Sequence, residues 1–159
     1  MTWPEPVERV ARVLRDARVE ARVEEFRDGT SSAEDAARAV GCTPAQIVKS
    51  LVFLANGRAL LVLVPGDRRA DRAKVAAAAG SARVRVAGPE EVRRATGFTA
   101  GGVAPFGLRE PHEVLVDPSV LTHELVWTGA GSPRHVAALA PADLVRLTRA
   151  RAVDVVADD

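Results

Sequence analysis

The chain has 159 residues, of which 47% are hydrophobic and 27% are charged, and its formal net charge is +1. This length and composition predict one globular domain, residues 1–159, with a core of its own. The balanced charge argues against a broad basic surface for duplex DNA, although a small local patch for the end of a nucleic acid is compatible with it. A single cysteine excludes an internal disulfide framework. Neither a signal peptide nor an apolar run of about 18 residues is present, so we expect no membrane association and a cytoplasmic location.

Hydrophobic periodicity and turn residues predict the elements of the first half. Asn56-Gly57 between two apolar runs is the strongest short-range signal and predicts a β-hairpin. In chain order we expect a helix at about 4–17, a strand at 22–26, a turn at Asp28-Gly29, a helix from a Ser31 cap with Glu34 to Val40, a turn at Thr43-Pro44, and hairpin strands at 47–54 and 58–64.

The second half alternates irregularly between helical and strand patterns. We expect helices at 71–79, from Pro89 to near Gly97 and at 141–148, strands at 83–86, 113–116, 124–128, 134–139 and 153–156, and a loop at 99–107. Together the elements predict an α/β or α+β domain with a mixed sheet flanked by helices.

Lys49 is out of place in its strand. The neighbouring residues are apolar and favour strands, so an unpaired ammonium group buried there would be costly. The chain has only two lysines, Lys49 and Lys74, among 22 basic residues. A lysine in such an arginine-rich chain suggests a need for a compact charge on a flexible stem. The alternative is a side chain that reaches solvent from the strand end. For Lys74 we expect an exposed helix face.

Several kinds of catalytic site find no support in the sequence. The three histidines, His112, His123 and His135, lack the spacing of a metal site, so we expect no metal and no cofactor. Cys42 has no supporting histidine motif, and there is no G-x-S-x-G nucleophile elbow. Walker A and dinucleotide-binding glycine motifs are also missing.

Two glycine-rich loops remain beside Lys49. The first runs through Gly101, Gly102 and Pro105, and the second contains Gly129 and Gly131, with His135 following. Glycines let a backbone approach a ligand closely, and proline fixes the exit of a loop. Each loop could equally be a plain turn, and a histidine such as His135 is more often a surface or hydrogen-bonded residue.

The order of these motifs resembles one known family. The run from Ala45 to Phe53, then Asn56-Gly57, the GGVAPFG loop, Val116-Asp117-Pro118 and the GxG loop are similar to the YbaK/prolyl-tRNA synthetase-associated editing domains. The resemblance covers about residues 22–155. It implies that family's fold, a mixed, barrel-like β-sheet flanked by helices.

The resemblance also implies site residues. The family's lysine falls on Lys49, its GxxxP loop on Gly101 and Pro105, and its GxGxxxH pattern on Gly129, Gly131 and His135. Gly102 lies within the first loop and, with the other loop residues, would bind the substrate. Ser50 follows the lysine, at a position linked in the family to selection of the amino-acid side chain.

By this resemblance the protein is a trans-acting aminoacyl-tRNA deacylase. It would hydrolyse the ester of mischarged tRNA, usually tRNA for proline, at the 3′ aminoacyl end, with prolyl-tRNA synthetase as a further partner. Lys49 would supply positive charge, and the vicinal ribose hydroxyl would help to activate water. Two alternatives stay open: a module that binds aminoacyl-tRNA or a nucleotide without hydrolysis, and an unrelated enzyme in which Lys49 forms a Schiff base.

Overall fold

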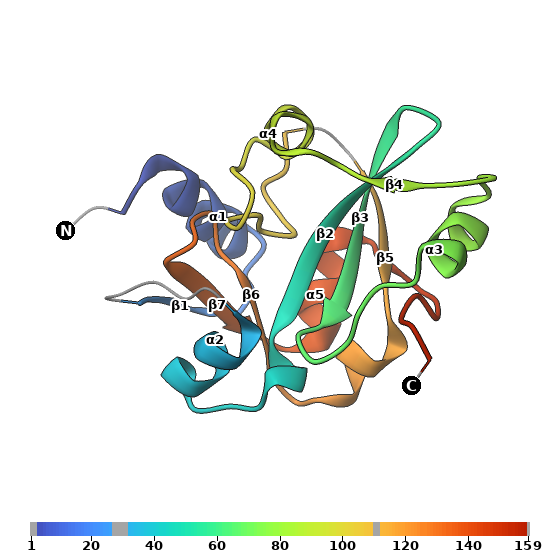
Figure 1. Cartoon of the computed structure of the whole chain (residues 1–159). Helices are drawn as coiled ribbons and strands as arrows, with labels where there is room; N and C mark the ends of the chain where they lie inside the picture. The colour runs from blue at the N-terminus through green and yellow to red at the C-terminus, as the bar shows by residue number, and fades with distance from the viewer. Residues whose placement is uncertain (1–2, 27–31, 110–111, 159) are drawn as a thin grey trace.

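The computed structural model describes residues 3–26, 32–109 and 112–158 (Figure 1). The predicted turn at Asp28-Gly29 and the Ser31 cap lie outside these ranges. Helices and strands alternate as α1 Glu5–Asp16, β1 Arg22–Glu25, α2 Ala33–Val40, η1 Pro44–Gln46, β2 Val48–Ala55, β3 Arg58–Pro65, α3 Arg72–Ala79, β4 Arg85–Val86, α4 Pro89–Thr96, β5 Glu113–Val116, η2 Pro118–Thr122, β6 Val126–Gly129, β7 His135–Leu139, α5 Pro141–Thr148 and β8 Arg151–Ala152.

The described strands form two sheets. One has the order β4-β2-β3-β5-β8 and mixes antiparallel with parallel pairs, and the other is antiparallel with the order β1-β7-β6. The predicted mixed α/β class is therefore confirmed. The described strands divide over two sheets and do not close into a barrel, because the pairing between β6 and the segment of β2 is limited to the isolated bridge between Ile47, just before β2, and Trp127.

The β2–β3 hairpin follows its sequence signal closely. Asn56 and Gly57 have φ values of 53° and 77°, which is the left-handed pair that a two-residue hairpin turn requires. Pairing runs from Ala55 opposite Arg58 to Val48 opposite Pro65. The hairpin therefore sets a single register for the strand that carries Lys49.

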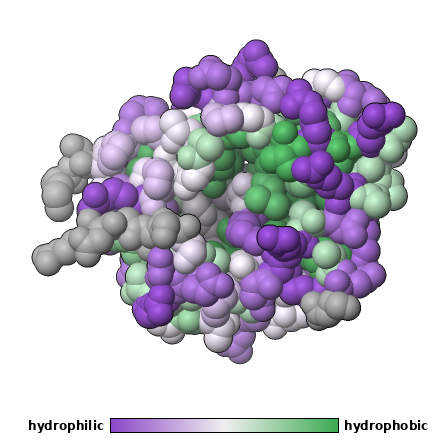
Figure 2. Space-filling model, viewed as in Figure 1, coloured by the Kyte–Doolittle hydropathy of each residue, from purple (hydrophilic) through white to green (hydrophobic). Residues whose placement is uncertain are grey.

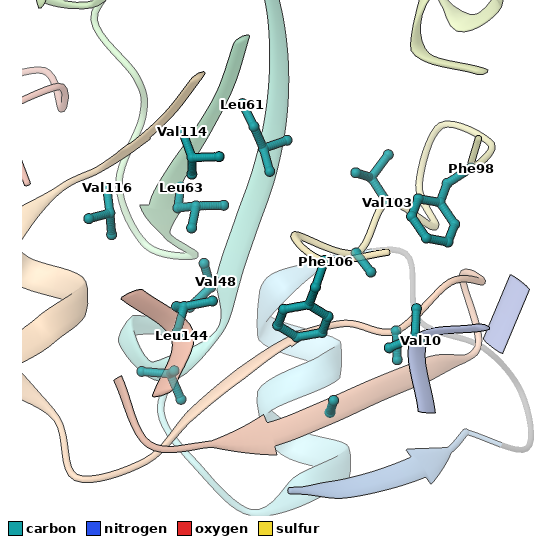
Figure 3. Close-up of a cluster of buried hydrophobic side chains, with 14 of the residues drawn as sticks. Val10, Val48, Leu61, Leu63, Phe98, Val103, Phe106, Val114, Val116 and Leu144 are labelled. Carbon is teal, nitrogen blue, oxygen red and sulfur yellow. The ribbon is translucent and has the colours of Figure 1, made fainter. Parts of the chain in front are cut away.

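Strand β3 lies at the centre of the molecule. Leu61 and Leu63 point into a core between the two sheets, which Val10 of α1 and Leu144 of α5 help to fill (Figure 3). The alternate residues of β3 belong to a second core under α3. Burial on both faces explains the continuous apolar run predicted as a central strand.

Three local expectations need correction. Helix α2 is capped by Ser32, whose side chain accepts a hydrogen bond from the Asp35 backbone N–H. The strand expected at 124–128 is β6, which begins at Val126. The strand expected at 153–156 is wrong: β8 ends at Ala152, and Val156 makes only an isolated bridge with Ala70.

The view in Figure 2 shows hydrophobic residues gathered on one half of this face and bordered by hydrophilic ones. Among the described helices, none combines the length and the apolar character that crossing a bilayer demands.

Candidate functional site

A cavity of about 410 Å³ opens where β2 and β6 separate. The two strands touch at the bridge between Ile47 and Trp127 and diverge beyond it (Figure 1). The start of α2 and both glycine loops complete the walls. Five of the eight predicted site residues line this cavity: Lys49, Ser50, Gly101, Gly129 and His135.

Lys49 does not extend into bulk solvent. Its ammonium group donates a hydrogen bond of 2.6 Å to the backbone carbonyl of Arg68. Burial lowers the pKa of Lys49, and the nearby positive charge of Arg69 lowers it further, while Asp67 and Glu34 act in the opposite direction. The ammonium group is thus held by a bond to the protein, and Lys49 also lines the cavity.

The turn that holds Lys49 depends on Gly66. A Cβ atom at this position would lie 2.6 Å from Ala33 Cβ and 2.7 Å from the Pro44 carbonyl oxygen. The Gly66 N–H also donates to the Ile47 carbonyl at 2.7 Å. This close approach fixes the turn after β3 and hence the Arg68 carbonyl, a partner of Lys49 that no local sequence signal reveals.

Lys74 has a structural role that the sequence did not indicate. Its ammonium group contacts the carboxylates of Asp154 and Asp158 and donates to the Val156 carbonyl at 2.8 Å. The expectation of a simply solvated side chain was therefore wrong. The lysine fastens the C-terminal segment against α3, next to the turn that carries Arg68.

The two lysines should titrate at different pH values. Burial lowers the pKa of Lys49, whereas hydrogen bonds to Asp158 and Asp154 raise the pKa of Lys74. A group with a lowered pKa loses its proton first as the pH rises, so we expect the Lys49 midpoint below that of Lys74. NMR of protein labelled with ¹³C at lysine Cε measures both, because the chain has only two lysines, and Lys74→Arg assigns the signals. A Lys49 midpoint equal to or above that of Lys74 would contradict the environment described here.

The two glycine loops pack against each other through their backbones. A Cβ on Gly129 would lie 2.4 Å from the Val103 carbonyl oxygen, and one on Gly102 would lie 2.9 Å from Ser132 Cα. Gly101 adopts a positive φ of 87° and lines the cavity. The glycines are thus needed for the loops to approach each other, which explains why they recur in both loops.

Three predicted site residues lie behind the cavity wall. Gly102 contacts the second loop, as described above. Gly131 has a φ of 107°, and a Cβ there would lie 2.7 Å from the Pro6 carbonyl oxygen at the start of α1. Pro105 is buried and borders a different hollow, beside Val13 of α1. These residues shape the loops from behind.

His135 begins β7 and is only 2% exposed. Its Nδ1 lies 2.6 Å from Ser132 Oγ, which itself accepts a hydrogen bond from the Arg134 backbone N–H. Ser132 Oγ and Nδ1 thus share a hydrogen bond, in which the tautomer of the imidazole decides which of the two is the donor. Nε2 faces Glu25, with its Oε2 3.5 Å away.

Burial lowers the pKa of His135, with Glu25 opposing and Arg134 adding to this shift. The imidazole is therefore neutral at pH 7. Within the described part of the chain, neither His135 Nε2 nor Ser50 Oγ has a hydrogen-bond partner, although both atoms are buried. Two buried side-chain groups without a partner, both in residues that line one cavity, are unusual in a native protein. Glu25 and Ser132 were not identified from the sequence because their roles arise only through His135.

Other reactive groups are placed less favourably. Burial raises the pKa of the Cys42 thiol, which keeps it protonated, and its sulfur contacts the Thr43 carbonyl. Among the described residues, no group of three or more His, Cys, Asp or Glu side chains is arranged to hold a metal ion. A hollow of about 550 Å³ at the far end of the hairpin, beside Arg58 and Arg85, includes none of the predicted site residues.

Comparison with known proteins identifies the class of domain. The family model of the aminoacyl-tRNA editing domain matches residues 27–147, and the chain belongs to this family. An uncharacterized Bacillus subtilis protein, YwhH, is 34% identical over 123 residues, which are 77% of this chain and 78% of YwhH. These findings confirm the family resemblance drawn from the sequence.

Further relatives include a region of a much longer synthetase and separate chains of about the same length as this one. A proline–tRNA ligase of Geobacillus sp. (strain WCH70) is 34% identical over 92 residues, which cover 58% of this chain but only 16% of that enzyme. A solved structure of a candidate trans-editing enzyme for prolyl tRNA synthetase is 36% identical, with a TM-score of 0.92 over 99% of this chain and 100% of that one. The structure of a hypothetical protein, APE2540, has a TM-score of 0.87 at 30% identity and covers 94% of this chain and 99% of that one.

Proposed function

We propose that the protein is a trans-acting deacylase that hydrolyses the ester of mischarged tRNA, with tRNA for proline as the preferred carrier. The observation that carries the proposal is that one cavity is lined by five predicted site residues, Lys49, Ser50, Gly101, Gly129 and His135. Membership of the editing-domain family and the likeness to a candidate trans-editing enzyme support it. Prolyl-tRNA synthetase would be the partner whose errors the protein corrects.

The reaction adds water to the ester carbonyl and releases the amino acid and the free ribose hydroxyl. In this proposal the Lys49 ammonium group stabilises the negative charge that develops on the substrate, either at the carbonyl oxygen or at the neighbouring phosphate. The backbones of the two glycine loops bind the aminoacyl-adenosine end, and His135 borders the aminoacyl group. A positioned carbonyl and a fixed charge together supply proximity and electrostatic stabilisation.

The attacking water needs a group that accepts its proton. In the structure Nδ1 of His135 contacts Ser132 and Nε2 faces Glu25, so neither nitrogen is offered to a water in the cavity. We therefore assign water activation to the hydroxyl of the terminal ribose that is vicinal to the ester: it accepts the proton of the water while it gives its own proton to the departing ribose oxygen. General-base assistance is typically worth about 10²–10⁴ in rate.

The ribose assignment predicts a large effect of one atom in the substrate. Removing the vicinal hydroxyl from the terminal adenosine should slow hydrolysis by about 10²-fold or more. Single-turnover rates with the ordinary and the deoxy substrate measure this effect, and equal binding of the two substrates is the control. Unchanged turnover of the deoxy substrate would reject the role of the ribose.

A deacylation panel tests the function itself. tRNA charged with Ala, Cys, Ser, Thr or Pro is incubated with the protein, and free amino acid is measured over time. Release from at least one mischarged tRNA is expected, with proline released slowest from its own tRNA. A protein that only binds aminoacyl-tRNA would give a footprint and no free amino acid, and that result would overturn the proposal. A separate hydrolytic site is useful because a synthetase pocket distinguishes two amino acids that differ by one methylene by only about 1–3 kcal/mol.

A further inference from the structure

The backbone N–H and C=O groups of Ser50 in β2 point away from β3. Antiparallel strands alternate between residues that exchange hydrogen bonds with the partner and residues whose N–H and C=O point to the other edge. The two-residue turn makes Ala55 and Arg58 a hydrogen-bonded pair, so Phe53, Leu51 and Lys49 bond to β3 as well. Ser50 is therefore among the residues that point outward.

Hydrogen bonds on both edges agree with this register. The Val52 carbonyl accepts from the Ala87 N–H at 3.0 Å, on the edge away from β3. The Ile47 carbonyl accepts from the Gly66 N–H, on the β3 side. Leu63, which lies opposite Ser50, turns its carbonyl toward β5 and accepts from Asp117. Ser50 thus has its N–H and C=O on the open edge.

No strand in the described part of the chain covers that edge at Ser50. The short β4 pairs with Phe53 and Leu54, and β6 lies beside β2 but pairs with this segment only at the bridge of Ile47, just before β2. Main-chain groups of this kind are nearly always paired in native proteins, with the chain, with water or with a ligand. The gap lies between two covered stretches of one strand, which makes it a local opening.

The cavity runs along this gap. Five consecutive residues, 47–51, line it. Consecutive side chains of a strand alternate between its two faces, so a cavity that touches all five must follow the strand edge, where the main chain lies. The N–H and C=O of Ser50 therefore open into the cavity, which Gly129 also lines.

We propose that Ser50 binds the aminoacyl group of the substrate through a two-bond β-bridge, an inference that rests on the proposed deacylase function. An α-amino ester carries an ammonium group and a carbonyl on one carbon, which is the donor and acceptor arrangement of a single strand residue. Its ammonium group donates to the Ser50 carbonyl, and its ester carbonyl accepts from the Ser50 N–H.

This bridge assigns a role in the reaction to a main-chain group. The Ser50 N–H polarises the ester carbonyl and stabilises the oxygen as negative charge develops on it, next to Lys49. It also favours substrates with a free α-ammonium group, whatever their side chain. A peptidyl or N-acylated tRNA keeps one amide N–H but loses the positive charge and adds an acyl group beside the Ser50 carbonyl, so we expect it to react much more slowly.

Two arms of one experiment test the bridge. In the first, each aminoacyl-tRNA of the panel is compared with its N-acetylated form, and the parent protein is expected to hydrolyse the acetylated form at least 10²-fold more slowly. In the second, the serine at position 50 is replaced by its α-hydroxy acid, which converts the N–H to an ester oxygen. We expect a fall in rate of about 10²–10³-fold, as for removal of one oxyanion donor.

Matched controls separate the main chain from the side chain. Ser50→Ala keeps the N–H and should retain far more activity than the backbone ester. A backbone ester at Val52, on the same edge but outside the cavity, should leave the rate nearly unchanged. Circular dichroism checks folding, which the substitution at position 50 should preserve because that N–H takes no part in the pairing with β3.

The outcomes distinguish the two proposals. If no panel substrate is hydrolysed, the deacylase function fails and the bridge fails with it. If acetylated substrates react as fast as free ones, the function stands and the bridge is overturned. The acetylation arm decides the matter even if the backbone ester does not fold.

Discussion

Replacement of Lys49 by alanine is expected to lower the rate of deacylation by about 10²–10³-fold and to leave the fold intact. The ammonium group is the positive charge that the protein fixes at the cavity by a 2.6 Å bond to the Arg68 carbonyl. Loss of one preorganised electrostatic contact typically has this magnitude. Single-turnover rates on the aminoacyl-tRNA panel measure the effect, and thermal unfolding monitors the fold.

Arg93→Ala is the matched control for this change. It also removes one positive charge, but from an exposed residue of α4 whose ion pair is with Glu90, and it should change the rate only slightly. Deacylation by Lys49→Ala at the parent rate would show that the lysine is not part of the active site. A Schiff-base mechanism is separated by borohydride trapping with a carbonyl substrate, for which we expect no adduct on Lys49.

Gly129→Ala is expected to destabilise the protein by about 1–3 kcal/mol and to reduce activity strongly. The new methyl group would lie 2.4 Å from the Val103 carbonyl oxygen, so the two glycine loops would have to move apart. Both loops contribute to the wall of the cavity, so a displacement of either loop disturbs the site. Urea unfolding gives the stability change, and the deacylation assay gives the activity.

Gly88→Ala provides the comparison for Gly129. Gly88 also has an ordinary φ, −78°, but the nearest atom to its added Cβ would be Glu91 Oε1 at 3.6 Å. A loss of about 0.5 kcal/mol is expected for the change at this helix cap. Equal stability losses for the two variants would mean that the close approach of the loops does not depend on the absence of a Cβ atom at Gly129.

Elements with strong local signals could be predicted from the sequence. The Asn56-Gly57 turn, the apolar run of β3 and the Gly41 and Gly80 helix ends all form as expected, because each depends on residues close in the chain. The order of strands could not be read in this way, and the division into two sheets appears only in the structure. The apolar residues of 153–156 resemble a strand, but Val155 and Val156 instead pack into the core under α3.

The candidate site was predicted in part. The lysine and the glycine loops stand out by residue type, and the family resemblance connects them. Their neighbours do not: the Arg68 carbonyl lies 19 residues from Lys49, and Glu25 meets His135 only across the β1–β7 pair. Partners of this kind depend on tertiary structure, since neither residue type nor spacing distinguishes them in advance.

The uncovered edge of β2 has a consequence for the solubility of the molecule. An unpaired strand edge can recruit a strand of another chain and begin aggregation. Here the charge of Lys49 flanks the opening, and the loops of Gly101 and Gly129 stand across from it. We expect these walls to hinder pairing with a strand of another chain, so that the open edge does not become a site of self-association.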